Sequence, residues 1–600
     1  MENFSGTLQC FSEVCQAFNH LNCKICHRCG LPLVKRYLWA SNNSRFVFNT
    51  GELIAQRYIS RGSNVFLDTM PKMLPEPVEN LPRSIQPYLK LSHILPHIPQ
   101  VFGKLSNDED IWLLEYGTVP IGSDGEPVYL ELLPTIEQLW TQSSPLQQIS
   151  WLLQLTRLWE PLNSQGVLST LLHPNLLRVN GDFVQLLELN YDHTKIVSLE
   201  DLGKVWLGWV DGASLSIKTF LYDLCQKLEN REITQIANLL PILENAQREI
   251  SSLYHWSYSL HILSDQGPSR EQNEDCCYPP SGTLLNSTET EDLLTLVCDG
   301  IGGQDSGEIA SQMAIDSLKT LPESLTPTDN IYQATKKAIF KANDLICQRN
   351  DREMRSQRQR MGTTLMMGLV KSNNIYLANV GDSRVYWITQ DSCLRLSVDD
   401  DVASRSVKLG LSLYREALDV VNSGALTQAL GTTPSSELYP NLQRQLPNQD
   451  CIILLTSDGL SDYDRIEQYW QPELLPLLRA EKELAQVGKN LVSLANLKNG
   501  HDNTTIALIL CRLSQNQDLK DFNLTISTIE HSILHQNDKP RQNRTKPITT
   551  PANKKTNNKI HRLIWLAGAF VLLGAGCWYF LSNNYSSRQE TTNTSKIQTQ

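Results

Sequence analysis

Strand-length apolar runs, each with an aspartate at its edge, constrain the fold of residues 257–512 more than any other feature. Short runs rich in Val, Ile and Leu and bounded by glycine are typical of buried β-strands. The runs LLTLVC, IYLANV and CIILLT precede Asp299, Asp382 and Asp458, and Asp502 precedes the run TTIALIL. Because the end of a core strand lies where the apolar interior meets a cleft, we expect these four carboxylates to converge.

Carboxylates that converge on one cleft repel each other unless cations neutralise them. One such aspartate is usually a cap or a turn residue, whereas four in the same setting indicate a metal site. A carboxylate site without His or Cys favours hard ions such as Mg²⁺ or Mn²⁺. Two such ions, about 3.5–4 Å apart, can clamp a phosphate and hold a bridging hydroxide as nucleophile. Arg270 adds a planar fork for two phosphate oxygens.

Further short motifs accompany these aspartates in a set order. Along the chain they are Asn273-Glu274-Asp275, Asp299-Gly300-Ile301-Gly302-Gly303, Gly307-Glu308, Met361-Gly362-Thr363-Thr364, Asn379 to Arg384, Ser457-Asp458-Gly459 and Asp502-Asn503. Over about Tyr254–Leu513 the ordered set resembles the PPM-type (type 2C) metal-dependent Ser/Thr protein phosphatases, and more closely their bacterial branch. The resemblance implies an α+β fold, a four-layer αββα sandwich of two antiparallel sheets flanked by helices, with the metals at one end.

The resemblance also implies the site residues and the reaction. The expected ligands of two Mn²⁺ or Mg²⁺ ions are Asp275, Asp299, the Gly300 carbonyl, Asp458 and Asp502, with Glu274 in the same shell and Asp382 for a third ion. Arg270 is the expected phosphate-binding residue, and it joins Asp299 and Asp458 as catalytic residues. The expected reaction is hydrolysis of phosphoserine and phosphothreonine in protein substrates by a metal-bridging hydroxide. The alternative is a catalytically weak, phosphatase-like scaffold or sensor that binds phosphoproteins.

Two positions depart from the family pattern. Ile301 stands where many eukaryotic members place a His proposed as general acid, which agrees with the bacterial branch and leaves a metal-bound water as the proton donor. Asp399-Asp400-Asp401 stands where the family often has Asp-His-Ser, at the entry to a flap formed by Ser404 to Gly431. This acidic stretch is either a solvated turn or a determinant of substrate choice.

The amino-terminal segment, residues 1–39, contains five of the 14 cysteines. The start of the chain has no basic region followed by an apolar core, so we expect these thiols to be reduced or metal-bound. Cys26-x₂-Cys29-Gly can turn two thiolates onto one Zn²⁺, and Cys10 and Cys15 would complete four ligands. The segment resembles a small zinc ribbon with one structural Zn²⁺. Cys23 competes as a ligand, and reduced cysteines without a metal are the alternative.

Residues 40–250 contain a weaker pattern. The stretch Leu172 to Leu177, followed by Gly181-Asp182 and Val184 to Leu189, resembles a protein-kinase catalytic loop and the strand after it. Leu171 lies near the position of the catalytic Asp, and Glu188 stands where a metal-binding Asp would be. The stretch is either a generic loop and hairpin, or part of a degenerate kinase-like α+β region without transferase activity. Such a region would serve in binding or regulation.

The carboxy-terminal part predicts a membrane anchor. Residues 514–562 are a polar basic linker, with eight Lys or Arg and no acid from Lys539 to Arg562. The run Leu563–Leu581 has 19 uncharged residues, about 28 Å as a helix, which suits a single transmembrane helix. Four basic residues lie just before this run, namely Lys554, Lys555, Lys559 and Arg562. The tail 582–600 has only two basic residues, Arg588 and Lys596. This asymmetry predicts a single-pass protein whose catalytic domain, 251–513, faces the cytoplasm.

The overall charge bears on the partners. The formal net charge is −11, whereas nucleic-acid binders usually carry a positive balance, so no nucleic-acid partner is expected. The expected partners are phosphorylated proteins and, through the carboxy-terminal helix, a membrane.

Overall fold

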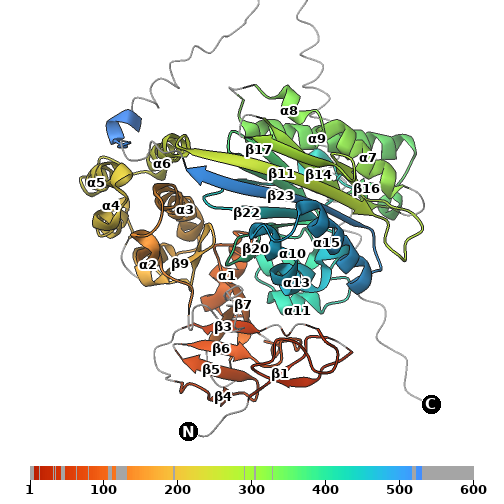
Figure 1. The fold of residues 1–600 in the computed structure, drawn as a ribbon, viewed down its shortest axis with the longest axis horizontal. Helices are drawn as coiled ribbons and strands as arrows, with labels where there is room; N and C mark the ends of the chain where they lie inside the picture. Colours follow the sequence, from red (N-terminus) through yellow and green to blue (C-terminus); the bar gives the residue numbers. More distant parts are fainter. Residues whose placement is uncertain are drawn as a thin grey trace, which may run out of the picture. The chain divides into compact units, whose positions relative to one another are not determined.

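The computed structural model describes residues 6–12, 14–31, 33, 35–41, 48–62, 64–78, 80–105, 111–115, 132–192, 196–288, 291–302, 306–326, 329–515 and 522–529. Within these residues two antiparallel sheets form the centre of the carboxy-terminal domain (Figure 1). The first sheet has the strand order β13 (Leu284–Thr288), β11 (Tyr254–Asp265), β23 (Thr504–Gln515), β22 (Cys451–Thr456), β19 (Arg384–Ile388) and β20 (Cys393–Arg395). The second has the order β12 (Cys276–Tyr278), β14 (Leu293–Cys298), β17 (Leu365–Lys371), β18 (Asn374–Val380) and β21 (Asn441–Gln445).

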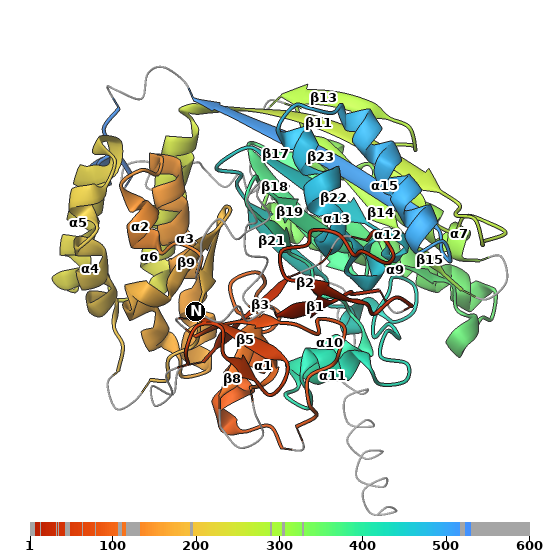
Figure 2. The same cartoon turned by 60° about the horizontal axis from the view of Figure 1, so that its bottom comes forward.

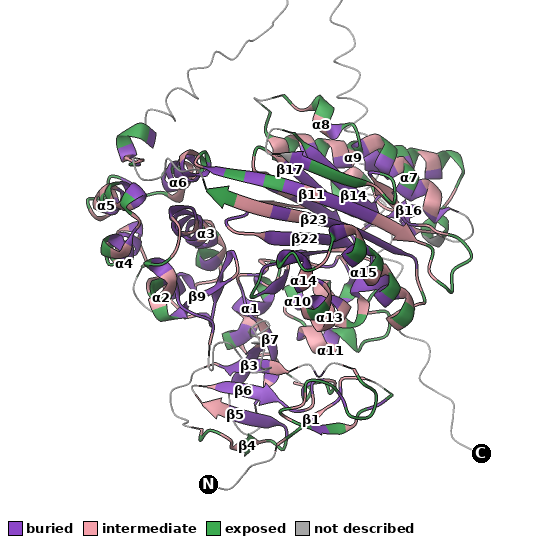
Figure 3. Cartoon of the chain, in the orientation of Figure 1, coloured by how far each residue is buried: buried purple, intermediate pink, exposed green. Residues whose placement is uncertain are grey.

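The central strands β14 and β22 are buried on both faces, and this explains why they read as continuous hydrophobic runs. In β22, Ile453 and Leu455 join the core between the two sheets, whereas Ile452 and Leu454 pack against helices on the outside. Strand β14 divides in the same way between an inner and an outer core. Because side chains alternate along a strand, a run buried on both faces has no polar position. Figure 3 shows these strands as the buried centre of the domain.

Helices cover the outer face of each sheet and complete four layers. Helices α7 (Gly307–Leu318) and α9 (Ile331–Arg352) pack on the second sheet through one apolar cluster. Helices α13 (Arg465–Glu473), α14 (Leu475–Leu478) and α15 (Leu484–Lys498) pack on the first sheet through another. The order helix, sheet, sheet, helix is the αββα arrangement that the resemblance implies, and strands β11 and β23 bring its two chain ends together.

The amino-terminal region forms a further sheet and a helical part. Its described strands follow the order β4 (Leu53–Ile54), β5 (Tyr58–Gly62), β6 (Val65–Asp68), β3 (Arg36–Ala40), β8 (Trp112–Glu115) and β7 (Gln100–Lys104). A small hairpin, β1 (Thr7–Gln9) and β2 (Phe18–His20), precedes this sheet. Strand β3 spans the expected boundary at residue 39, so the sheet begins before residue 40.

A helical part follows that sheet and carries one more hairpin. It contains α2 (Ile136–Trp140), α3 (Pro145–Ser164), α4 (Leu199–Leu207), α5 (Leu215–Glu229) and α6 (Ile236–Ser251), with the hairpin of β9 (Leu177–Asn180) and β10 (Phe183–Leu186). The short helix α1 (Gln86–Lys90) lies earlier in the chain, between β6 and β7. Leu171 is fully buried, and Glu188 accepts a hydrogen bond of 2.9 Å from Trp39 Nε1 of β3. The kinase-like interpretation of this region stays a prediction.

The hairpin β9–β10 contacts the carboxy-terminal domain through buried groups. The ring centroids of Phe183 and Trp387 lie 5.6 Å apart, edge to face. In the turn, Asp182 accepts hydrogen bonds from Trp387 Nε1 (3.2 Å) and Gln449 Nε2 (2.7 Å), and burial raises its pKa to about 7. The amino-terminal region and the sandwich therefore share one continuous core within the compact unit of residues 1–537.

One part of the expected polar linker is packed rather than solvated. Leu524, Ile526 and Ile529 are buried, and the Leu524 amide donates to the Ser216 carbonyl at 2.7 Å. The prediction of a polar linker over 514–562 is therefore wrong for residues 522–529. The reason is that three apolar side chains close together in the sequence bury their surface on the helical part of the amino-terminal region.

Candidate metal centre and phosphate site

The strand ends bring the predicted acidic residues to one end of the sandwich. Asp299 lies between β14 and β15 (Gly300–Ile301), and Asp382 lies between β18 and β19. Asp458 begins α12 (Asp458–Ser461) directly after β22, and Asp502 precedes β23. Both sheets thus supply strand ends to the same place. The predicted convergence is seen in the electrostatics, since the neighbouring carboxylates of Asp275, Asp458, Asp382 and Asp502 all act on Asp299.

Hydrogen bonds hold this cluster in position. Asp275 Oδ2 accepts a hydrogen bond of 2.8 Å from Ser457 Oγ, which ties the start of β12 to the residue before Asp458. The Asp299 amide donates to Thr364 Oγ1 at 3.0 Å. Asn503 Oδ1 accepts from the Glu274 amide at 2.9 Å, and its Nδ2 donates to two backbone carbonyls. Side-chain amides and hydroxyls around the cluster therefore orient the backbone that carries the acids.

The carboxylates of the cluster have strongly perturbed pKa values. Burial, together with Asp275 and Asp458, raises the pKa of Asp299 well above its ordinary value. Burial, together with Asp382 and Asp462, does the same to the pKa of Asp458. The pKa values of Asp382 and Asp275 rise to about 7 and about 6, again chiefly through burial. Burial and mutual repulsion both disfavour the charged carboxylates, and divalent cations held between them would stabilise the charged form.

At two positions of the site the backbone is packed too closely for any residue but glycine. A Cβ on Gly300 would lie 2.6 Å from the Glu274 carbonyl oxygen, and one on Gly307 would lie 2.8 Å from Glu274 Oε2. Such contacts are shorter than real Cβ atoms make, so glycine is required at both positions. The Gly300 backbone and the Glu274 side chain consequently lie together at the start of α7, as the predicted ligand set requires.

The donor set fits hard divalent cations. Among the described side chains of this cluster, Asp458 Oδ1 is buried without a hydrogen-bond partner. A buried carboxylate oxygen without a donor is costly unless a cation binds it. All the predicted ligands offer oxygen, from carboxylates or from the Gly300 carbonyl, which is the chemistry that Mn²⁺ and Mg²⁺ accept.

Arg270 lies at the edge of the cluster and remains partly accessible. Its Nη2 donates to Asp502 Oδ2 at 2.7 Å, and its Nε donates to the His501 carbonyl at 3.1 Å. The side chain is 46% exposed. The hydrogen bond to Asp502 raises the pKa of Arg270, so the guanidinium stays charged. A cation fixed at the rim of an acidic pocket is suited to bind a phosphate there.

Two acidic residues of the site were not assigned from the sequence. Asp462 raises the pKa of Asp458, and Asp462 itself is largely buried. It ends the motif Ser457 to Asp462, four residues after Asp458, and this one-turn spacing was the signal that could have identified it. The second is Asp399, whose carboxylate adds to the effect of burial and raises the pKa of Asp382.

The acidic stretch at the flap is not a solvated turn. Asp399 is 3% exposed and accepts hydrogen bonds from Arg384 Nη2 (2.8 Å) and from Arg384 Nε. Asp400 accepts from the Gly381 amide at 2.9 Å, and Asp401 caps α10 (Val402–Lys408) through the Ser404 amide. The interpretation as a solvated turn is wrong because each carboxylate has a partner that folding brings from another segment or from the next helix.

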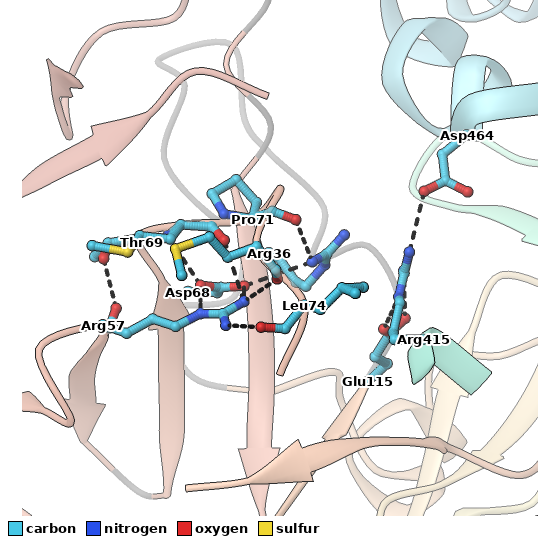
Figure 4. Close-up of polar contacts among 11 residues, drawn as sticks. Arg36, Arg57, Asp68, Thr69, Pro71, Leu74, Glu115, Arg415 and Asp464 are labelled. Atoms are coloured by element: carbon cyan, nitrogen blue, oxygen red, sulfur yellow. Dashed lines mark hydrogen bonds and ion pairs between the residues drawn. The ribbon is translucent and has the colours of Figure 1, made fainter. Parts of the chain in front are cut away.

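The flap also contacts the amino-terminal sheet through Arg415 (Figure 4). This residue lies in α11 (Tyr414–Leu418), and its Nε and Nη2 donate to the Glu115 carboxylate at the end of β8, at 2.8 and 3.2 Å. Its Nη1 lies 3.4 Å from Asp464 Oδ2, in the segment that follows Asp462. Burial raises the pKa of Glu115, but Arg415 and Arg36 outweigh it and lower that pKa. One guanidinium therefore connects the amino-terminal sheet, the flap and a loop of the acidic site.

The four cysteines predicted as zinc ligands gather at the amino-terminal hairpin, two in its turn and two in the segment after β2. The Sγ atoms of Cys10, Cys15, Cys26 and Cys29 all lie within 4.8 Å of one another, and Cys23 is not part of this group. Cys10 Sγ and Cys29 Sγ are 3.6 Å apart, as are Cys15 Sγ and Cys26 Sγ. Burial is outweighed at Cys26 by hydrogen bonds from the Cys29 and Arg28 amides, which lower its pKa to about 6. Four thiols at this spacing, one of them easily ionised, suit a tetrahedral Zn²⁺ site.

Comparison with known proteins identifies the carboxy-terminal domain. The sequence profile described as protein phosphatase 2C matches residues 264–471. The chain contains a protein phosphatase 2C domain. The predicted family and enzyme class, a protein serine/threonine phosphatase, are thereby confirmed, while the individual ligand assignments stay predictions.

Relatives of the phosphatase domain come from several bacteria. The serine/threonine phosphatase stp of Listeria welshimeri is 27% identical over 257 residues, which are 42% of this chain and 95% of that protein. The phosphatase PstP of Mycobacterium tuberculosis is 29% identical over 245 residues, 41% of this chain and 43% of that protein. A crystal structure of that PstP matches 42% of this chain and 98% of its own, at 27% identity and a TM-score of 0.36. Another PstP catalytic domain, solved with two manganese ions, matches with a TM-score of 0.35.

The predicted membrane span, Leu563–Leu581, lies outside the described residues, as do the tail 582–600 and the rest of the linker. Among the helices that the structure describes, none combines the length and apolar character needed to cross a bilayer.

Proposed function

We propose that this chain hydrolyses phosphoserine and phosphothreonine in protein substrates with two Mn²⁺ or Mg²⁺ ions, and a third at Asp382. The observation that carries the proposal is the acidic cluster at one end of the sandwich, with Asp458 Oδ1 buried and unpartnered and Arg270 at the rim. When bound, the ions would neutralise the phosphate and activate a water for attack. Asp275, Asp299, the Gly300 carbonyl, Asp458 and Asp502 would hold them, with Glu274 beside them.

The chain's own residues would position the phosphate. Nε and Nη2 of Arg270 are bound to the His501 carbonyl and to Asp502, so the guanidinium is held at a fixed angle. Within the described residues its Nη1 makes no hydrogen bond and remains available for a phosphate oxygen. Arg270 would thus draw the phosphate against the acidic cluster and orient it, because a planar charged donor in fixed geometry loses little freedom on binding.

Dependence of turnover on a divalent cation tests this proposal. We expect the full chain to hydrolyse a phosphothreonine peptide in Mn²⁺, to lose turnover on chelation, and to regain it when Mn²⁺ alone is returned. Return of Mn²⁺ without Zn²⁺ separates the acidic cluster from the cysteine group. Tight binding of the phosphopeptide without hydrolysis, at saturating Mn²⁺ or Mg²⁺, would favour the scaffold or sensor instead.

We also propose one structural Zn²⁺ on Cys10, Cys15, Cys26 and Cys29. Their mutual spacing within 4.8 Å supports it. Metal analysis of the purified full chain should give about one equivalent of zinc, and Cys26→Ser should abolish it. The control is Cys23→Ser, which changes a neighbouring thiol outside the group and should retain the metal. Zinc-free protein with all thiols titratable would contradict the assignment.

Finally, we propose that Leu563–Leu581 anchors the enzyme to a membrane with the phosphatase domain on the cytoplasmic side. The support is the length of the apolar run and the excess of Lys and Arg before it. Full-length protein should sediment with membranes, whereas a chain that ends at residue 537 should not. Protease that digests the phosphatase domain only from the outer face would reverse the proposed orientation.

A further inference from the structure

A cleft lies between the amino-terminal hairpin β1–β2, called the cysteine hairpin below because the cysteine group lies at it, and the phosphatase domain. It has a volume of about 400 Å³, and Phe11 and Val14 of the hairpin form one wall. The other wall belongs to the phosphatase domain: it is formed by Tyr463 with the first turns of α13, and by the end of α15 with the residues up to His501. Figure 2 shows the hairpin β1–β2 next to α13.

The charged side chains that line the cleft, among the described residues, are all positive. They are Lys72, Arg465 and Lys498, with His501 beside them, and no acidic side chain accompanies them in the lining. The contrast with the chain as a whole is strong, since its net charge is −11. A concave surface lined by one sign of charge attracts ligands of the opposite sign.

Neutral acceptors hold Arg465 and leave its charge uncompensated. Its Nε donates to Asn499 Oδ1 at 2.9 Å, and its Nη1 donates to Gln468 Oε1 at 3.2 Å. The guanidinium carbon lies 5.4 Å from the centre of the Tyr463 ring. Within the described part of the chain, neither Arg465 nor Lys498 forms an ion pair with a carboxylate. A fixed arginine without an acidic partner is a ready binding group for a carboxylate.

The cleft lies next to the phosphate site, which it meets at His501. The His501 carbonyl at its edge accepts the hydrogen bond from Arg270 Nε, and Asp502 follows directly in the chain. Tyr463, just before α13, follows Asp462 of the acidic cluster. A peptide whose phosphoryl group lies at Arg270 could therefore extend its neighbouring residues into the cleft. Exposed apolar side chains, Val14, Tyr463 and Leu497, are available there for contact with such a chain.

We propose that this cleft binds the segment next to the phosphorylated residue of the protein substrate and selects segments rich in acidic side chains. The proposal rests on the proposed function and adds a substrate class to it. The cleft needs both partners, because the basic groups lie mainly on the phosphatase domain and Phe11 and Val14 lie on the cysteine hairpin. The amino-terminal segment would thus contribute to substrate choice.

Two phosphothreonine peptides of equal length, one flanked by Asp and Glu and one by Ser and Gln, test the proposal. With the full chain and saturating Mn²⁺, we expect a higher kcat/KM for the acidic peptide. The double variant Arg465→Gln, Lys498→Gln should reduce the ratio between the two peptides by about 2- to 30-fold, the range for two partly exposed ion pairs. The matched control Arg479→Gln, Lys489→Gln removes the same charges from exposed positions outside the cleft and should leave the ratio unchanged.

A binding measurement separates this proposal from the proposed function. Fluorescence anisotropy of the labelled acidic peptide needs no turnover, and its affinity for the full chain should fall in the double variant and with added salt. If neither peptide is hydrolysed but the full chain still binds the acidic peptide more tightly, the proposed phosphatase activity is contradicted and the proposed binding role of the cleft is supported. Equal affinity for both peptides, or a preference for the acidic peptide that persists in the double variant, would contradict the proposal that the cleft selects acidic segments. If the double variant unfolds at a lower temperature than the native chain, the single variant Lys498→Gln replaces it in both measurements.

Discussion

The variant Asp299→Asn should lower kcat/KM for a phosphothreonine peptide by more than about 100-fold, beyond the range typical of groups that only support metal ligands. Asp299 lies at the centre of the cluster, since burial and four neighbouring carboxylates act on it. Amidation removes the negative charge of an expected ligand of the two ions while it preserves the size of the side chain. The measurement is steady-state turnover over a series of Mn²⁺ concentrations, with thermal unfolding as the check that the variant is folded.

Arg270→Ala provides the contrast to that variant. It should raise KM by about 10- to 100-fold, the effect of losing a charged hydrogen bond. The Mn²⁺ concentration for half-maximal activity should change less than KM, because the guanidinium contacts Asp502 from the rim and is not itself a ligand. An Asp299→Asn enzyme that keeps a tenth of its activity, or an Arg270→Ala enzyme altered only in its Mn²⁺ requirement, would contradict these roles.

Asp399→Asn should destabilise the protein by about 3–5 kcal/mol, the typical cost of removing one partner of a buried ion pair. The Asp399 side chain is 2% exposed and pairs with Arg384 at 2.8 Å and with Arg395 at 3.4 Å. Burial disfavours the Asp399 charge, yet the two arginines outweigh it and lower the pKa of Asp399. The neutral amide would leave the guanidinium groups of Arg384 and Arg395 without their ion-pair partner. Chemical denaturation of the native and variant chains measures the difference.

The control for this prediction is Asp391→Asn. Asp391 lies on the loop between β19 and β20, is exposed, and undergoes the same chemical change. Its free energy of unfolding should stay within about 0.5 kcal/mol of the native value. If Asp399→Asn were as mild as this control, the pair with Arg384 would be a surface contact of little energetic weight.

Local patterns in the sequence were sufficient to predict the acidic site. Strands buried on both faces read as continuous apolar runs, and the chain must become polar where such a strand leaves the core. Asp299 and Asp458 follow runs of this kind, and glycine follows each of them where the backbone is crowded. The four zinc-ligand candidates were also predicted from their spacing, because a Cys-x₂-Cys-Gly turn is closed by its own backbone, with the Gly30 amide 2.9 Å from the Cys26 carbonyl.

Contacts between distant segments could not be predicted in the same way. The partner of Glu115 lies 300 residues later in α11, and the partner of Leu524 lies some 300 residues earlier in α5. The cleft beside Arg465 exists only because the cysteine hairpin lies against loops of the phosphatase domain.

By itself, the sequence determined which residues are acidic at strand ends, which cysteines can share a metal, and therefore the kind of chemistry available. Only the tertiary structure decided which charges are compensated. Asp399 is paired and buried, Arg415 joins the flap to the amino-terminal sheet, and Arg465 is left without a carboxylate among the described residues. The physical reason is that apolar periodicity is a property of neighbouring residues, whereas the energy of a charge depends on every group that folding brings within a few ångströms.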